Sequence, residues 1–325
     1  MILVTGATGM LGGHLLWHLL QTEKRVRVLK RNNSNLTQLR LIFSFYHDNL
    51  DNYSQNIEWS IGDVLDTASL QTVFEGVDTI YHCAAIVSFS ETSPDILATN
   101  VQGTKNIVDV LFQKPIRKFC FVSSIAALGT TKKDVLITEN LAWEANEKIS
   151  PYALSKYLSE KIVWEAAEKG LPAVIVNPGV ILGAGLANNG TMKLFRTVDK
   201  GLPIYTNGGS GYVDVKDVCK AMIQLTQGNI IGERFVLVGE NLSNREILNT
   251  IADALGKHRP FICGKSWWMM PLATLLEFAS KFLQKKTILD RGTVRSTLHR
   301  SYYSSEKIKI RLHFHFSSIE NSIKE

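Results

Sequence analysis

The sequence predicts an α/β fold in which helices cover both faces of a parallel sheet. Two observations lead to this prediction: short runs of β-branched and aromatic residues alternate with segments of helical length, and turn residues close most of these runs. Such repeats favour right-handed crossovers, so a ligand should bind at the carboxyl ends of the strands. Strands are expected at 2–5, 26–29, 57–61, 79–83, 118–123 and 173–176, and helices at 11–21, 96–112 and 152–168.

From residue 179 onward the pattern changes, and we expect the chain to build a second, smaller lobe. Gly and Asn gather at 183–190 and 207–211, and the strands between the helices become short. Residues 234–238 have the composition of one more strand of the main sheet, which would make the two lobes interleaved. The expected division assigns 1–178, with a return segment at about 212–240, to the sheet domain, and 179–211 and 241–325 to the smaller lobe.

The composition excludes several classes of protein. Hydrophobic residues make up 45% of the chain and charged residues 20%, a balance that rules out disordered, collagen-like and coiled-coil proteins. The longest apolar stretch, 267–278, is interrupted by Pro271, Thr274 and Glu277 and is too short to span a membrane. The net charge of +6 is spread along the chain, so no nucleic-acid partner is expected.

Cysteine usage and the N-terminus predict a cytoplasmic protein without a metal site. The four cysteines lie far apart with no C-x-x-C pair, which fits neither a zinc site nor a disulfide framework. His14 and His18 on the first helix lack a Cys or carboxylate partner, so no metal is expected there. The first residues run from an apolar strand straight into a turn and cannot serve as a signal peptide.

A glycine-rich loop joins the first strand to the first helix. Its sequence, TGATGMLG, occupies residues 5–12. Glycine is needed where the backbone turns sharply and approaches a pyrophosphate closely, while the helix N-terminus offers amide groups and a positive dipole end. This combination predicts a Rossmann-type doubly wound sheet with a smaller, interleaved C-terminal substrate lobe. The residues expected to bind the dinucleotide are Gly6, Thr8, Gly9, Met10, Leu11 and Gly12.

The residues after the second and third strands predict which dinucleotide binds. Where a carboxylate would hold a free ribose 2′-hydroxyl, this chain has Lys30 and Arg31. Two cations suit a 2′-phosphate, so NADP is the expected cofactor and NAD the alternative; a solvated basic loop is the competing interpretation. Asp63, after the third strand, either accepts from the adenine amine or caps the next helix, and both interpretations stay open.

A tyrosine and a lysine are expected to form the catalytic pair. Ser150 is a good N-cap and Pro151 suits the first helical position, which places Tyr152 in the first turn and Lys156 one turn later on the same face. A cation beside a phenol at the positive end of a helix should lower the pKa of the phenol. Ser124, at the end of the fifth strand, shares a sheet edge with the glycine loop and is placed to polarise a carbonyl.

Together these motifs resemble the extended short-chain dehydrogenase/reductase family, within the NAD-dependent epimerase/dehydratase superfamily. The resemblance extends over nearly the whole chain and rests on residues 5–12, 63–64, 82–85, 100–104, 123–124 and 152–156. Residues 177–179 and 212–215 are similar to the branch that contains dihydroflavonol reductases and 3β-hydroxysteroid dehydrogenases.

The resemblance implies a role for each matching residue. Tyr152 would act as the general acid/base, Lys156 would hold the nicotinamide ribose, and Ser124 would bond the substrate oxygen. Asn100 would support a water chain to the lysine. The remaining matches imply cofactor contacts at Val64, Cys83, Ala84, Ala85, Asn177, Pro178 and Gly179. Substrate contacts beside the nicotinamide are expected at Ile86, Phe89 and Ile125.

Two departures from the family pattern narrow the expected activity. Ser124 is followed by Ile125, Ala126 and Ala127, so the acidic pair that sugar dehydratases place there is absent. The segment 209–213 lacks the Arg-Asp-Phe pattern of nucleotide-sugar epimerases, which argues against a diphosphate clamp.

The sequence therefore predicts an NADP-dependent oxidoreductase that moves a hydride between the nicotinamide and the carbonyl or alcohol carbon of a fairly apolar small molecule. A nucleotide-sugar epimerase-type isomerase with tightly bound NAD and a non-catalytic dinucleotide-sensing protein are the alternatives. A homodimer is one option for the assembly.

The helix expected at 267–286 has an apolar face that admits three interpretations. The plainest is packing on its own lobe; the others are a roof over the substrate site and contact with a membrane surface, and of these two we favour the roof. The apolar positions are 272, 275, 276, 279, 282 and 283.

Overall fold

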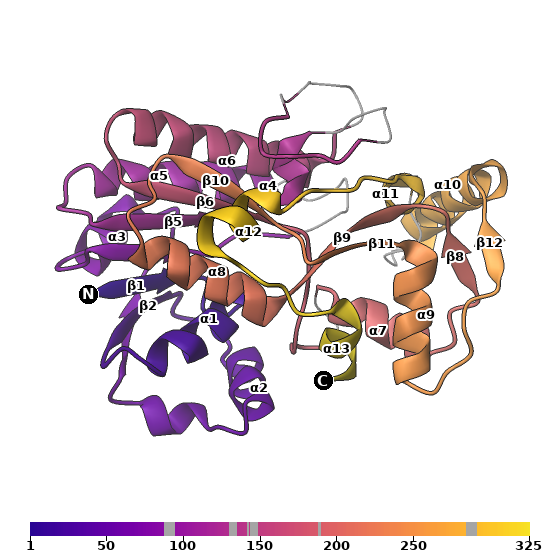
Figure 1. Ribbon diagram of the computed structural model, residues 1–325, viewed down its shortest axis with the longest axis horizontal. Coiled ribbons are helices and arrows are strands. Elements are labelled where there is room, and N and C mark those ends of the chain that lie inside the picture. Colours follow the sequence, from indigo (N-terminus) through magenta and orange to yellow (C-terminus); the bar gives the residue numbers. More distant parts are fainter. Residues whose placement is uncertain (88–94, 130–134, 142, 144–148, 188–189, 284–290) are drawn as a thin grey trace.

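A computed structural model describes residues 1–87, 95–129, 135–141, 143, 149–187, 190–283 and 291–325, and for 279–283 the backbone alone. Seven parallel strands form the main sheet in the order β10-β6-β5-β4-β1-β2-β3 (Figure 1). They are β1 (Ile2–Thr5), β2 (Val26–Lys30), β3 (Ile57–Ile61), β4 (Thr79–His82), β5 (Lys118–Val122), β6 (Ala173–Pro178) and β10 (Glu233–Leu237). The α/β prediction is confirmed, and every predicted strand lies within two residues of its observed bounds.

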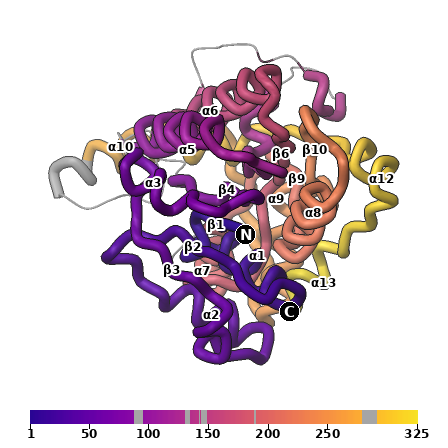
Figure 2. Tube along the Cα trace, turned by 90° about the vertical axis from the view of Figure 1, so that its left-hand side faces the viewer, coloured from indigo at the N-terminus to yellow at the C-terminus, as the bar shows by residue number. Residues whose placement is uncertain are grey.

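Helices cover both faces of this sheet (Figure 2). On one face lie α1 (Met10–Leu20), α2 (Thr37–Phe45) and α8 (Val215–Gln227), and on the other α3 (Thr67–Val73), α5 (Gly103–Leu111) and α6 (Pro151–Glu168). Strand residues alternate between the two apolar layers: Val4 and Val28 pack with the first set of helices, Leu3 and Leu29 with the second. Both faces are therefore buried, as is usual for parallel sheets.

Short elements fill the connections between the strands and the larger helices. Two are 3-10 helices, Leu50–Tyr53 and Ile125–Leu128. Before α5, the one-turn helix α4 (Asp95–Leu97) continues into a π-helix, Ala98–Gln102. The helix therefore has a wider turn at Asn100, the residue that was expected to support a water chain to Lys156.

The smaller lobe is built around a three-stranded sheet ordered β11-β9-β7. Its strands are β7 (Val180–Leu182), β9 (Gly209–Asp214) and β11 (Glu240–Ser243), and a two-stranded sheet pairs β8 (Ile204–Thr206) with β12 (Ile262–Gly264). The helices here are α7 (Met192–Asp199), α9 (Asn244–Ala254), α10 (Ser266–Leu283), α11 (Arg291–Leu298) and α13 (Ile319–Lys324). Between β9 and β11 the chain returns through α8 and β10 to the main sheet, where α12 (Glu306–Leu312) packs beside β10 (Figure 1).

Helix α10 does not bury the face that the sequence predicts. Met269 and Ala273 are its buried positions and pack against α11, whereas Leu275 is 65% exposed. Trp267 and Phe278, which share the side of Leu275, are 76% and 75% exposed. Small Ala273 and flexible Met269 let α11 approach closely, which turns the predicted face outward. Positions 279, 282 and 283 lie outside the residues whose side chains are described.

Within the described ranges, no helix combines the length and the apolar composition that crossing a membrane requires.

Two buried histidines form hydrogen bonds between segments that are far apart in the sequence. The ring of His14 in α1 is bonded to the Tyr46 hydroxyl (2.7 Å) and the Ala184 carbonyl oxygen (3.0 Å), and burial lowers its pKa to about 4. The ring of His82 in β4 lies between the hydroxyls of Thr5 (2.7 Å) and Thr104 (3.2 Å), and burial lowers its pKa to about 3. Both rings are neutral in the folded protein near pH 7.

The fold should lose stability as the pH falls through the window that these histidines set. Unfolded histidines titrate near pH 6.5, so between about pH 6.5 and 4 the unfolded chain binds more protons than the folded chain, and lowering the pH favours unfolding. At pH 5 each histidine should cost about 2 kcal/mol relative to pH 7. Urea denaturation at pH 7 and pH 5 measures the change, and His14→Gln should lose its share of it. An equal free energy of unfolding at both values would contradict the prediction.

Candidate active site

The glycine-rich loop between β1 and α1 has no room for side chains at two positions. Gly6 has φ +76°, and a Cβ there would lie 2.5 Å from the backbone nitrogen of Ala84. A Cβ on Gly12 would lie 2.3 Å from the Gly6 carbonyl oxygen. The loop therefore packs against the segment after β4 and against the first turn of α1. Gly9 at the N-cap makes no side-chain hydrogen bond to the first amides of α1. Their predicted role in binding a phosphate stays a prediction.

The predicted adenosine end of the site is a surface cavity of about 460 Å³ at the ends of β2 and β3. Arg31 and Asp63 both line it, whereas Lys30 does not. The helix-cap interpretation of Asp63 is wrong: Asp66 caps α3 by accepting from the Ala68 amide (3.1 Å). The Asp63 carboxylate instead accepts from the Leu65 amide at 3.0 Å, within the turn before that helix.

Val64 lies in the core rather than on the surface of this cavity. Its side chain is 8% exposed and packs so closely on α5 that a Cβ at Gly103 would meet it at 2.8 Å. Its carbonyl oxygen accepts a hydrogen bond from Asn106 at 2.9 Å. Val64 therefore joins the turn after β3 to α5. Its predicted contact with the cofactor stays a prediction.

Asn100 holds the segment that follows β4. Its Oδ1 accepts from the Ile86 amide (2.8 Å), and its Nδ2 donates to the Ile86 carbonyl oxygen (3.0 Å) and to Ser155 Oγ (3.0 Å). Residue 100 lies in the π-helix, and its carbonyl oxygen also accepts from the hydroxyls of Thr104 and Ser159. These contacts make Asn100 a clamp between Ile86 and α6. The water chain to Lys156 that the resemblance implies for this residue stays a prediction.

The three proposed catalytic side chains meet at the carboxyl end of β5. Helix α6 begins as predicted, with Ser150 accepting from the Ala153 amide (3.2 Å) and proline in its first turn. Tyr152, 8% exposed, forms a hydrogen bond with the Ser124 side chain. The Lys156 ammonium, 5% exposed, donates to the Val122 carbonyl oxygen at 2.8 Å and lies over the Phe121 ring.

Burial controls the protonation of this group. It raises the pKa of the Tyr152 phenol, an effect that the hydrogen bond with Ser124 partly offsets. The prediction that Lys156 lowers this pKa is wrong for the chain by itself, because its ammonium is bonded to the Val122 carbonyl and desolvation of the phenol dominates. Burial lowers the pKa of Lys156 to about 8, opposed by Cys83 and the Glu160 carboxylate. Tyr152 is therefore protonated at neutral pH, as a proton donor must be.

The end of β6 closes the site on the side of the smaller lobe. Pro178 is the last residue of β6, and a Cβ at Gly179 would lie 2.4 Å from the Gly211 carbonyl oxygen. The Asn177 side chain is fully buried and donates to the Ser124 carbonyl oxygen at 3.0 Å. The sequence predicted a cofactor contact for this residue and missed the hydrogen bonds of its side chain. It also missed the buried Glu160, although spacing of four residues after Lys156 places it on the same helix face.

The structure describes two of the three predicted substrate residues. Ile86 is half-buried beside Asn100, while Ile125 is 7% exposed and packs in a small core with Leu128 and Val236. Ile125 therefore offers little surface to a substrate, and its predicted substrate contact stays a prediction. Phe89 lies outside the described residues.

Among the described residues, no three His, Cys, Asp or Glu side chains come together as a metal site.

Comparison with known proteins identifies a protein family that this chain matches. The model of the NAD dependent epimerase/dehydratase family matches residues 2–237. The chain is 28% identical to a putative dihydroflavonol 4-reductase of Synechocystis sp., over 99% of this chain and 92% of that protein. It is 27% identical to sterol demethylase protein B of Methylococcus capsulatus, over 88% of this chain and 84% of the relative.

A solved structure shares the fold over the whole chain. The crystal structure of gox2253 superposes with a TM-score of 0.80 at 26% identity, over 100% of this chain and 96% of that one. The likeness thus includes the smaller lobe as well as the main sheet.

Proposed function

Because the chain belongs to the NAD dependent epimerase/dehydratase family, we propose that it is an NADP-dependent oxidoreductase acting on a carbonyl or alcohol carbon of a fairly apolar substrate. One observation carries the proposal: Ser124, Tyr152 and Lys156 converge at the carboxyl end of β5, on the sheet edge that also carries the glycine loop. A hydroxyl pair beside a cation suits proton transfer to a carbonyl oxygen.

Each part of the site would have its own role in binding or catalysis. The glycine loop would hold the pyrophosphate, Arg31 the 2′-phosphate, and Lys156 the nicotinamide ribose. When bound, the cofactor supplies or accepts the hydride. In the direction of reduction, Ser124 donates a hydrogen bond to the substrate oxygen, and Tyr152 gives its proton to that oxygen as the carbon gains the hydride.

The choice of NADP rests on Arg31 in the cavity at the ends of β2 and β3. A charge-assisted hydrogen bond contributes about 1.5–3 kcal/mol, so NADPH should bind about tenfold to a hundredfold more tightly than NADH. Arg31→Asp should reverse this order, because the new carboxylate repels the 2′-phosphate and accepts from a free 2′-hydroxyl. Fluorescence titration of both variants with both cofactors measures the ratio. Equal affinity of the unmodified protein for NADH and NADPH would contradict the prediction.

The proposed apolar substrate is supported by the residues beside the site and by the relatives. The three residues directly after Ser124 are apolar and carry no carboxylate, and two relatives are named a putative dihydroflavonol 4-reductase and a sterol demethylase protein. The test is NADPH consumption by the purified protein against a panel of aldehydes, ketones and nucleotide sugars. Activity confined to nucleotide sugars would refute the proposal and favour an epimerase-type isomerase.

We assign the exposed face of α10 to the apolar substrate, as a roof over its site. Trp267, Leu275 and Phe278 present this face in the smaller lobe. Removing two of them with Trp267→Ser and Phe278→Ser should raise KM for an apolar carbonyl about tenfold or more and change kcat little, because only apolar contact is lost. Salt-sensitive co-sedimentation of the unmodified protein with anionic vesicles, lost in this double variant while KM stays unchanged, would show membrane contact instead.

A further inference from the structure

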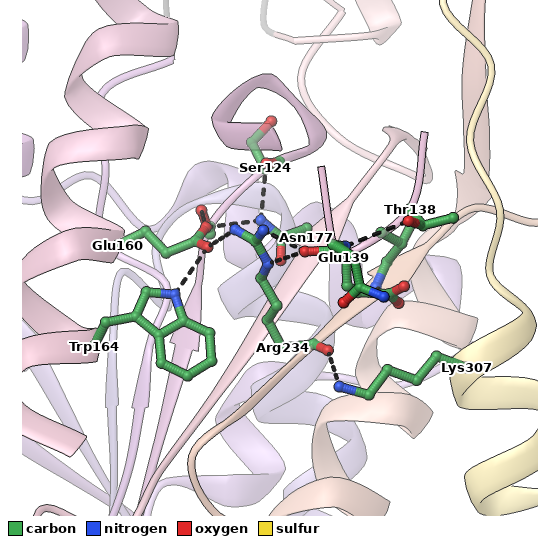
Figure 3. A network of polar contacts seen from close by, with 11 residues as sticks. Ser124, Thr138, Glu139, Glu160, Trp164, Asn177, Arg234 and Lys307 are labelled. Atoms are coloured by element: carbon green, nitrogen blue, oxygen red, sulfur yellow. Dashed lines mark hydrogen bonds and ion pairs between the residues drawn. The ribbon is translucent and has the colours of Figure 1, made fainter. Parts of the chain in front are cut away.

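A buried polar network lies beside Ser124 (Figure 3). At its centre is the Glu160 carboxylate of α6, whose side chain is 2% exposed. It accepts hydrogen bonds from Ser123 Oγ (2.5 Å), Asn177 Nδ2 (2.8 Å) and Arg234 Nη1 (2.7 Å). Trp164 adds a longer contact at 3.3 Å. The single buried charge is thus paired with a guanidinium and bonded from two strand ends, the arrangement that a buried ion pair requires.

Arg234 is itself held in place by other elements (Figure 3). Its Nε donates to the Glu139 carbonyl oxygen at 2.9 Å, and the Glu139 carboxylate accepts from the Val236 amide at 2.9 Å. Lys307 of α12 donates to the Arg234 carbonyl oxygen at 2.9 Å. The guanidinium therefore has a fixed position in β10 from which it can fix Glu160.

The network joins the two halves of the catalytic set. On α6, Tyr152, Lys156 and Glu160 follow one another at intervals of four residues and share one helix face. On the strand side, Asn177 Nδ2 donates both to the Ser124 carbonyl oxygen (3.0 Å) and to Glu160. The strand end that carries the Ser124 hydroxyl is thereby tied to the helix that carries Tyr152.

We propose that Glu160 and Arg234 are positioning residues for the hydride transfer, a role that rests on the function proposed above. They fix α6 against the ends of β5 and β6, so that Ser124 and Tyr152 keep the separation at which both reach one substrate oxygen. They act through Ser123, Asn177 and the helix rather than by contact with the substrate. Small displacements of such groups are costly, since about 1 Å can reduce turnover about a hundredfold.

The test begins with Glu160→Gln, which keeps the shape of the side chain and removes its charge. We expect kcat to fall about tenfold or more while KM for the substrate stays within about twofold. The matched control is Glu165→Gln on the same helix, because Glu165 is about half exposed and pairs with Lys161 at 3.9 Å. This control should leave kcat unchanged.

A pH profile supplies a readout that a purely structural role would not move. The charged and titratable groups around Lys156 are His82 at the end of β4, Cys83 directly after it, and Tyr152 and Glu160 from α6. The Glu160 carboxylate opposes the fall in the pKa of Lys156 that burial causes. Without that charge, the limb of the kcat profile that follows Lys156 should move to lower pH, by about half a unit or more.

A double variant separates positioning from stability. Glu160→Leu with Arg234→Met removes both charges and leaves no unpaired ion. The Tm of this double variant should therefore lie within a few degrees of that of the unmodified protein. Its kcat should remain as low as that of Glu160→Gln. Recovery of kcat together with Tm would overturn the proposal, as would an unchanged kcat and pH profile in Glu160→Gln. Tyr152→Phe distinguishes the two failures: if that variant stays fully active the proposed function is wrong, whereas an inactive Tyr152→Phe beside a fully active Glu160→Gln overturns the positioning role alone.

Discussion

Replacing Tyr152 by phenylalanine is expected to lower kcat by about 100-fold or more while leaving the affinity for NADPH close to normal. The change removes only the hydroxyl that bonds Ser124, and loss of a general acid typically costs two to four orders of magnitude. The Tyr152 side chain is 8% exposed, and phenylalanine keeps the aromatic ring that packs there. The fold should therefore tolerate the change. Steady-state kinetics with any carbonyl that the protein reduces gives the measurement.

Two comparisons make this result interpretable. Tyr157→Phe, five residues later on the same helix and half-buried, is the matched control and should keep its turnover. Lys156→Ala should damage both turnover and NADPH binding, since the ammonium would hold the ribose. A Tyr152→Phe variant with full activity would make Tyr152 a structural residue and the proposed mechanism wrong.

Arg234→Met is expected to cost the folded protein about 3–5 kcal/mol. The substitution keeps the apolar stem of the side chain and leaves the carboxylate of Glu160 buried without its cation, which is far more costly than removing both charges. Urea unfolding followed by circular dichroism measures the loss. The exposed pair Arg259 and Asp253 provides the contrast: Arg259→Met should leave the free energy of unfolding nearly unchanged, because both groups face solvent.

Adding Glu160→Leu to Arg234→Met should restore most of the lost stability. Two apolar side chains of similar size can fill the place of a buried ion pair at little cost. If Arg234→Met alone lost no more stability than Arg259→Met, the pair would not be a buried, compensated charge.

Local sequence patterns predict the main sheet well because each strand carries its own information. The runs at 2–5 and 57–61 match β1 and β3 at both ends, and the N-cap serine and first-turn proline place the start of α6 at Pro151. The glycine loop was predictable for the same reason: a positive φ at Gly6 and the close approach of Gly12 to Gly6 are needs that only glycine meets.

Such local patterns could not predict contacts between segments that are far apart in the sequence. Arg234 reaches Glu160 across 74 residues, and a lone arginine at the edge of a predicted strand gives no sign of its partner. The raised pKa of Tyr152 follows from tertiary burial, while the helix position alone suggests the opposite direction. In α10 apolar residues such as Trp267, Met269 and Phe278 also lie outside the predicted face, so the packing of α11 on Met269 decides which side is buried.

Consumption of NADPH by the purified protein, measured with apolar aldehydes and ketones beside nucleotide sugars, tests the central claim most directly. The account predicts oxidation of NADPH that depends on an apolar carbonyl, is proportional to enzyme, and falls about 100-fold or more in Tyr152→Phe. Binding of the dinucleotide without consumption by any carbonyl, or equal rates for the unmodified protein and the Tyr152→Phe variant, would contradict it.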